Sequence, residues 1–302
     1  MSTLLRMIPS VLMIVSPILI TAIGGMICEK SGVVNIALEG LMGLGACAAA
    51  SAHVLMEATG MGTPSVWLAL AIGAGVGLVF SIIHAVAAIN FNADQTISGT
   101  GINLLADGVT IFVAQILFSA DRTREFRMGM QTDKLGIYPT AYIALVVVIL
   151  AWFVLYKLPF GMHLRACGEH PQAADSVGIN VRKIRYIAVL TSGLLAGLAG
   201  GCIVLTQTIQ YTSNTINGRG FIALAAVSFG RWRPVGVTFA AFLFGTAQAF
   251  SIIAVNFPAL KALPTEVFNI LPYVITLIAL VLFSGKNFAP RANGQPFIKG
   301  AS

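Results

Sequence analysis

The chain has 302 residues, of which 57% are hydrophobic and only 10% are charged. Soluble domains carry about 25% charged residues, so this composition excludes an ordinary soluble protein and indicates a helical membrane protein. The formal net charge of +7 gathers at the ends of apolar runs and forms no basic stripe interleaved with aromatic residues. We therefore expect a lipid bilayer, and no nucleic acid, as the partner of these charges.

Long apolar runs predict eight membrane-spanning helices, because crossing a bilayer takes about 20 residues of helix. In chain order, the predicted spans are residues 9–28, 33–56, 64–89, 96–119, 141–156, 184–209, 235–255 and 265–283. A further apolar piece at 221–230 is too short to cross unaided. The predicted fold is all-α, a polytopic transmembrane bundle with about 8–10 membrane segments. We expect residues 1–302 to form a single transmembrane domain.

Two further patterns organise the bundle. Lys and Arg favour the cytoplasmic side of a membrane, and a cytoplasmic C-terminus places most of the 18 Lys and Arg residues on that side. This orientation leaves the N-terminus outside. The glycine-rich stretches GAGVG, at 73–77, and SGLLAGLAGG, at 192–201, predict close helix packing through small residues.

No motif for catalysis or for metal binding is visible. The stretch GGMICEKS, at 24–31, approaches the spacing of a phosphate-binding loop, but Glu29 stands where the second glycine is needed. His53 and His84 are single histidines near span ends, where neighbouring groups are expected to satisfy them. The cysteines form no C-x-x-C pair and are interpreted as packing residues; they are Cys28, Cys47, Cys167 and Cys202. We predict no catalytic residue, metal site or cofactor in this chain.

Polar residues inside the predicted spans are candidates for lining a translocation path. Asn35 and Glu39 are four residues apart and share one helical face, as do Asn103 and Asp107. Ionisable groups at membrane depth are costly and often line a pathway. Gln207 belongs to the polar stretch TQTIQYTSNTINGRG, which could line the outer mouth of a cavity. Each carboxyl group could instead join helices or cap a broken helix, and this alternative stays open.

A compact polar stretch, GMHLRACGEHPQAADSVGIN at residues 161–180, interrupts the apolar sequence. Pro171 suits the first position of a helix, Glu169 complements its positive end and Gly178 can stop it. A helix of about seven residues cannot stabilise itself. Its alanines suit a close contact with another protein better than insertion into lipid. The stretch therefore predicts a short cytoplasmic docking helix.

The same stretch closely resembles the cytoplasmic coupling region of ATP-binding-cassette importer permeases of the ribose and branched-chain amino acid type. The segment AIGGMICEKSGVVNIALEGLMGLGA resembles the N-terminal signature of the subgroup linked to nucleoside uptake. TEVFNILPYVITLIALVLFSGK resembles the last span of the family. Two positions depart from the pattern: Cys28 stands where a serine is usual, and His170 where an asparagine is usual.

The resemblance implies a permease subunit of a binding-protein-dependent, ATP-driven importer in a prokaryotic plasma membrane. It implies nucleosides as substrate, with a branched-chain amino acid or a simple sugar as alternatives. The implied partners are cytoplasmic ATPase subunits that bind ATP and Mg, a homologous second permease or a second copy of this chain, and an extracytoplasmic substrate-binding protein. The residues implied in coupling to the ATPase are Gly168, Glu169, His170, Pro171, Ala173, Ala174 and Gly178.

A hypothesis from another class also stays open. The chain could be a self-sufficient proton-coupled transporter, in which Glu39 and Asp107 carry the protons. Such a carrier would work without an ATPase and would stop when a protonophore is added.

Overall fold

The computed structural model describes residues 3–254 and 288–299, together with positions 270, 274, 277, 278 and 281. In these residues, seven helices are long and apolar enough to cross a membrane. They are α1 (Thr3–Lys30), α2 (Leu38–Ala58), α3 (Pro64–Ala85), α4 (Gln95–Phe118), α5 (Pro139–Lys157), α8 (Val181–Ile203) and α10 (Pro234–Ala254). The predicted span at 265–283 lies almost entirely outside the described residues. The all-α, polytopic fold predicted from composition is confirmed.

Shorter elements connect the long helices. They are α6 (Pro159–Glu169), α7 (Pro171–Ser176), α9 (Arg219–Phe229) and two π-helical turns, Val86–Asn90 after α3 and Val204–Thr208 after α8. The short apolar piece predicted at 221–230 is α9, which has 11 residues and does not reach the length of a span. Helix α6 was not predicted. Its start follows a simple rule, because Pro159 occupies the first helical position, where the missing N–H is harmless.

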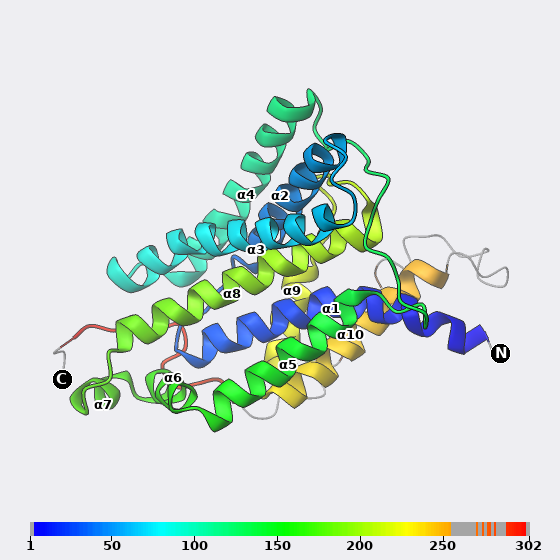
Figure 1. Ribbon diagram of the computed structural model, residues 1–302. Coiled ribbons are helices and arrows are strands. Elements are labelled where there is room, and N and C mark those ends of the chain that lie inside the picture. Colours follow the sequence, from blue (N-terminus) through cyan, green and yellow to red (C-terminus); the bar gives the residue numbers. More distant parts are fainter. Residues whose placement is uncertain are drawn as a thin grey trace.

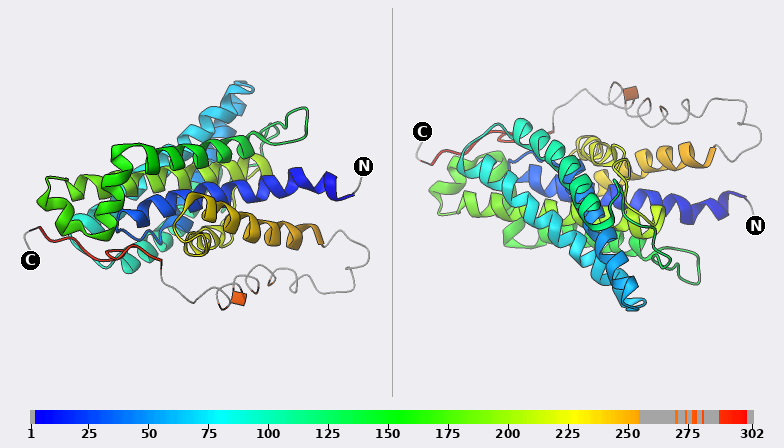
Figure 2. Two further views of the ribbon diagram at one scale, coloured as in Figure 1. Left: turned by 90° about the horizontal axis from the view of Figure 1, so that it is seen from below. Right: turned by 90° about the horizontal axis from the view of Figure 1, so that it is seen from above.

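Helix α1 lies inside the bundle and is more fully buried than any other candidate span in the described chain. It packs against α5, α8, α9 and α10, and the views from below and above show it between these helices (Figure 2). Helix α3 runs along α8, whereas α4 packs mainly on α2 and leans away from the other helices (Figure 1). Helix α7 lies at the end of the bundle opposite the start of α1 (Figure 1).

Glycines set the contact between α2, α3 and α8. A Cβ added to Gly197 of α8 would lie 2.4 Å from the carbonyl oxygen of Gly73 in α3. A Cβ on Gly45 of α2 would lie 2.4 Å from the Cα of Gly197, and one on Gly77 would lie 2.4 Å from the carbonyl oxygen of Gly193. No side chain fits between these backbones. The close packing predicted from the two glycine-rich stretches is confirmed.

The second span begins later than predicted. Residues 31–37 are not helical, and α2 starts at Leu38. Gly32 has a φ of +93°, a conformation that L-residues with a side chain rarely adopt. The Oδ1 atom of Asn35 accepts a hydrogen bond from the backbone N–H of Ala37 at 3.1 Å, which closes a local turn. Two valines inside this irregular segment made it look continuous with the span.

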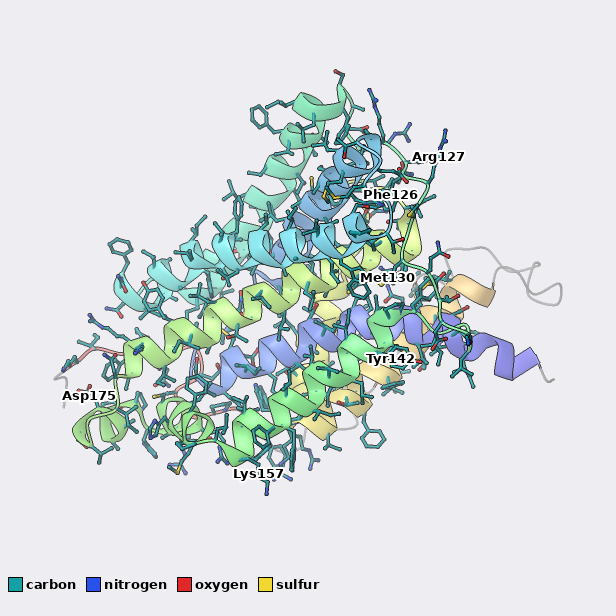
Figure 3. The ribbon with its side chains drawn as sticks, viewed as in Figure 1. Phe126, Arg127, Met130, Tyr142, Lys157 and Asp175 are labelled. Carbon is teal, nitrogen blue, oxygen red and sulfur yellow. The ribbon has the colours of Figure 1, made fainter. Side chains whose placement is uncertain are left out.

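The end of the bundle away from α7 is covered by the connection between α4 and α5. This connection pairs with the chain after α8: the backbone N–H of Phe126 bonds the carbonyl oxygen of Ile209 at 3.1 Å, and that of Met130 bonds Leu205 at 2.8 Å. Figure 3 shows Phe126, Arg127 and Met130 at this end, with Asp175 of α7 at the other.

His53, His84 and the four cysteines are buried inside the fold. His53 Nε2 lies 2.6 Å from the carbonyl oxygen of Met128, and the two ring nitrogens of His84 lie 3.0 Å from Ser98 Oγ and 2.9 Å from the carbonyl oxygen of Val34. Neighbours satisfy both ring nitrogens of His84, as predicted, but only one of His53, because the buried Nδ1 of His53 has no hydrogen-bond partner among the described residues. All four cysteines are buried and free. Within the described ranges, no three His, Cys, Asp or Glu side chains gather in a group that could hold a metal ion.

Candidate functional site

Glu39, in the first turn of α2, binds the N-terminus of α9. Its Oε1 accepts a hydrogen bond from the backbone N–H of Gly218 at 2.7 Å, and its Oε2 accepts one from Gly220 at 2.6 Å. The first N–H groups of a helix lack partners inside the helix, and the helix dipole is positive there. Buried Arg219 lies between these two glycines in the chain. The structure therefore places Glu39 as the cap of a broken helix.

Two asparagines hold the irregular segment before α2. Asn103 of α4 accepts a hydrogen bond from the N–H of Gly40 at 2.8 Å and donates one to the carbonyl oxygen of Ile36 at 3.0 Å. Asn35 is fully buried, and its Nδ2 donates to Ser192 Oγ of α8 at 2.7 Å. Both amides therefore bind the backbone and a neighbouring helix inside the fold.

Gln207 lies in the π-helical turn that ends the α8 segment. Its Nε2 donates a hydrogen bond to the carbonyl oxygen of Met13 in α1 at 3.0 Å. The side chain is half-buried and joins α8 to α1.

Asp107 has a different environment. It is exposed in the middle of α4, and its carboxylate has no hydrogen-bond or ion-pair partner among the residues that the structure describes. Thr100, Leu104, Ile111 and Gln115 lie on the same side of α4, at intervals of three or four residues, and all are at least partly exposed. We call these five residues the α4 stripe. Three of the five are polar, within a helix long and apolar enough to span a membrane.

Helix α7 has one buried and one exposed side. Pro171 is its first residue, and Gly178 follows its end with a φ of +86°, as the sequence predicted. Pro171 and Ala174 are buried against the bundle, whereas Ala173 and Val177 are exposed. The two alanines therefore face in different directions. The exposed side also carries the polar residues Gln172 and Ser176, and its side chains are free to contact another protein.

The C-terminal segment at 288–299 holds the start of α7. The backbone N–H of Ala292 donates to the carbonyl oxygen of Gly168 at 2.9 Å, and Arg291 Nη1 lies 3.4 Å from Nε2 of exposed His170. Gly168 needs to be glycine, because a Cβ there would lie 2.2 Å from the carbonyl oxygen of Lys30. Three separate parts of the chain therefore meet directly before α7.

Arg185 of α8 strengthens this junction from inside. It is 1% exposed, and its Nε donates to the carbonyl oxygen of Ser31 at 3.2 Å. Its Nη1 donates to the carbonyl oxygen of Gln295 at 3.0 Å. A single buried guanidinium thus ties α8 to the segment after α1 and to the C-terminal segment. The start of α7 is therefore connected to α1 and α8 by direct contacts.

Comparison with known proteins identifies the family. The protein family described as "Branched-chain amino acid transport system / permease component" matches residues 7–280. The chain belongs to this family. The permease is 42% identical to the guanosine ABC transporter permease protein NupQ of Bacillus subtilis (strain 168), over 97% of this chain and 96% of NupQ.

Two further relatives extend the comparison. The permease is 36% identical to the nucleoside ABC transporter permease protein NupC of Lactococcus lactis subsp. cremoris (strain MG1363), over 99% of this chain and 98% of NupC. It is 27% identical to NupP, a second guanosine ABC transporter permease protein of Bacillus subtilis (strain 168), over 95% of this chain and 84% of NupP.

Membership of this family makes the chain the membrane-embedded permease of a transport system and not its ATPase. The stretch that approaches a phosphate-binding loop has another use. Glu29 is 5% exposed, and its Oε2 accepts a hydrogen bond from the indole Nε1 of Trp232 at 2.6 Å. The stretch is the packed end of α1 in this permease.

The path residues predicted for this permease come together only in part: Asn103 contacts the segment that carries Asn35 and Glu39, whereas Gln207 and Asp107 lie apart from it. Asn35, Glu39, Asn103 and Gln207 form internal hydrogen bonds, whereas Asp107 is exposed on α4. The prediction missed the other members of the α4 stripe, although the spacing of polar residues along α4 carries the signal. It also missed the segment at 288–299, whose backbone bonds have no signature in the sequence.

Proposed function

We propose that this permease carries nucleosides into a prokaryotic cell across the plasma membrane, as the membrane subunit of an ATP-driven importer. Two relatives that match it over nearly their full length are named for guanosine and for nucleosides, which supports this substrate class. A branched-chain amino acid and a simple sugar are the alternatives that an uptake assay must separate.

The α4 stripe is the observation that carries the proposed path. A carboxylate and an amide that face lipid at membrane depth are costly, and such groups usually face a bundle interior or water. A path between α4 and a second permease would hydrate Asp107 and Gln115. Thr100 and these two side chains can form hydrogen bonds with ribose hydroxyls and base edges. Leu104 and Ile111 offer apolar contacts between the polar groups.

A homologous second permease is the partner that we propose across the α4 stripe. NupQ and NupP are both named as permease proteins of a guanosine transporter in one organism, and this chain is more similar to NupQ than to NupP. The presence of two different permease proteins in that organism supports pairing of this chain with a NupP-like permease over pairing with a second copy of itself.

The exposed side of α7 is the proposed docking site for the ATPase, which would bind ATP and Mg. Ala173 and Val177 would enter a groove of the ATPase, and the contacts of Gly168 and Arg185 would pass its movement to α1 and α8. This places α7 and the C-terminus in the cytoplasm. The substrate-binding protein would dock at the opposite end, near Phe126.

Uptake by the reconstituted transporter tests the proposal. Proteoliposomes that contain this chain with its copurifying subunits would be loaded with ATP or with a non-hydrolysable analogue and given labelled guanosine, uridine, leucine or ribose. We expect ATP-dependent uptake of the nucleosides, unaffected by a protonophore. Uptake of leucine or ribose alone would overturn the substrate class. Uptake by this chain without ATP, stopped by a protonophore, would instead support a proton-coupled carrier that uses Asp107.

A further inference from the structure

A basic cavity lies at the α7 end of the permease, next to the docking helix. Its volume is about 620 Å³. It is lined by Lys30, Tyr156, Arg165, Glu169, Arg231, Arg233, Phe288 and Pro290. These residues come from α1, α5, α6, the connection between α9 and α10, and the C-terminal segment. Four of them are bases and one is an acid.

The connection between α9 and α10 is built to present two of these bases. Arg231 and Trp232 have φ angles of +53° and +52°, which is uncommon for residues other than glycine. Two such residues in succession need support, and the buried bond from the Trp232 indole to Glu29 supplies it at 2.6 Å. Backbone bonds from Arg231 to Ser228 and from Arg233 to Gly230, both 3.1 Å, close the turn. Arg231 and Arg233 therefore reach the cavity from either side of an anchored Trp232.

The described residues do not neutralise the bases in the cavity. Lys30 feels the like charges of Arg165 and Arg233, and Glu169 is the acid that opposes them. None of the four bases forms an ion pair with an acid in the described part of the chain. Arg231 lies over the ring of Phe288 at 4.4 Å, and Arg165 lies over Tyr156 at 5.1 Å. An anion in this cavity would relieve the mutual repulsion of the bases.

We propose that this cavity binds a phosphate group, carried either by the headgroup of an anionic phospholipid or by a soluble phosphate compound. Guanidinium groups match phosphate oxygens through paired hydrogen bonds, and three of the four bases are arginines. Basic pockets between membrane helices bind acidic headgroups. Lys30 and Tyr156 lie at the ends of α1 and α5, the depth of a headgroup, where Lys157 also lies over the Trp152 ring at 5.6 Å.

The bound phosphate would also stabilise the region around the docking helix. Glu169 lines the cavity and is the last residue of α6, directly before α7. A phosphate bridging Arg165 to Arg231 and Arg233 would fix α6 against the connection between α9 and α10. We expect the occupied permease to unfold at a higher temperature than the empty one.

Two probes distinguish the sources of the phosphate. The full chain, with the subunits that accompany it, would be placed in nanodiscs of phosphatidylcholine with or without 20% phosphatidylglycerol, and inorganic pyrophosphate would be added separately. Retained lipid would be measured by native mass spectrometry, and unfolding by tryptophan fluorescence. The test variant is Arg231→Gln with Arg233→Gln. The matched control is Arg182→Gln with Lys183→Gln, which removes two exposed bases outside the cavity.

We expect the test variant to bind its anion about 30-fold more weakly, since each base near an acidic headgroup contributes about 1 kcal/mol. We expect the control variant to bind the anion as the wild type does. Retention of phosphatidylglycerol alone would identify a lipid site, and a response to pyrophosphate in phosphatidylcholine would identify a site for soluble phosphate. If the test variant does not fold, Arg165→Gln on α6 replaces it. The proposal would be overturned if neither probe binds or stabilises the permease, or if the control variant loses as much anion binding as the test variant. It would also be overturned if the four bases are shielded from solvent only when the ATPase is bound.

Discussion

The carboxylate of Glu39 accepts a hydrogen bond from the backbone N–H of Gly220 at 2.6 Å, although 181 residues separate the two along the chain. One side chain of α2 therefore satisfies backbone N–H groups at the start of α9. This bond also distinguishes Glu39 from Asp107, the other carboxyl group that the sequence predicts at membrane depth. Glu39 is bound inside the fold, whereas Asp107 is exposed on α4.

Glu39→Gln should destabilise the fold. The amide would point an N–H group at a backbone N–H and would leave one buried backbone donor of α9 without its acceptor. We predict that the free energy of unfolding falls by about 2–4 kcal/mol. Thermal unfolding of the purified full chain measures this change. The matched control is Asp107→Asn, which should change stability by less than about 0.5 kcal/mol but reduce uptake. Equal stability of the two variants would contradict the assignment of Glu39 as a helix cap.

Gly197→Ala should disrupt the contact of α8 with α2 and α3. The new methyl group would meet the carbonyl oxygen of Gly73 at 2.4 Å, so the helices must separate. We predict a loss of about 1–3 kcal/mol in the free energy of unfolding. Gly75→Ala in α3 is the control, because a Cβ there has no atom within 4 Å. A tolerated Gly197→Ala would show that these helices pack less closely than described.

The native cysteines should not react with N-ethylmaleimide in the folded chain. All four are buried, and burial raises the pKa of Cys167, in α6, to about 11. The thiolate is the reactive form, so near pH 7.5 almost none is available, and the fraction rises only as the pH approaches the raised pKa. Intact-mass spectrometry measures the labelling. Ala173→Cys, at an exposed position of α7, should be labelled readily. Fast labelling of Cys167 would show that α6 opens.

Opposite effects are expected from arginine at the two alanines of α7. Ala173→Arg places a charge on the exposed side and should abolish ATP-dependent uptake with stability unchanged. Ala174→Arg places the charge on the buried side and should reduce the amount of folded protein, because a buried charge without a partner is strongly destabilising. Uptake and thermal unfolding, measured together, separate the two effects. Normal uptake by Ala173→Arg would argue against docking through this side.

The elements that depend on local chemistry could be predicted from the sequence. Seven spans follow from apolar runs of sufficient length, since a bilayer demands them. The short helix α7 follows from Pro171 and Gly178, whose backbone preferences are independent of the rest of the chain.

The role of Glu39 could not be predicted, because a carboxylate that caps a distant helix and one that lines a path have the same pattern. Only the packing of α2 against α9, 179 residues away at Gly218, decides between them. The irregular segment at 31–37 was missed for a similar reason. Its valines are apolar enough for a span, and its turn is held by Asn103 from α4.

We propose that this permease binds a separate ATPase through the exposed side of α7. Native mass spectrometry of the gently extracted complex would compare the wild type with Ala173→Arg and with Leu135→Arg. Leu135 is exposed and lies in the connection between α4 and α5. We expect an ATPase bound to the wild type and to Leu135→Arg but lost from Ala173→Arg. An ATPase retained by all three, or bound by none, would contradict this proposal.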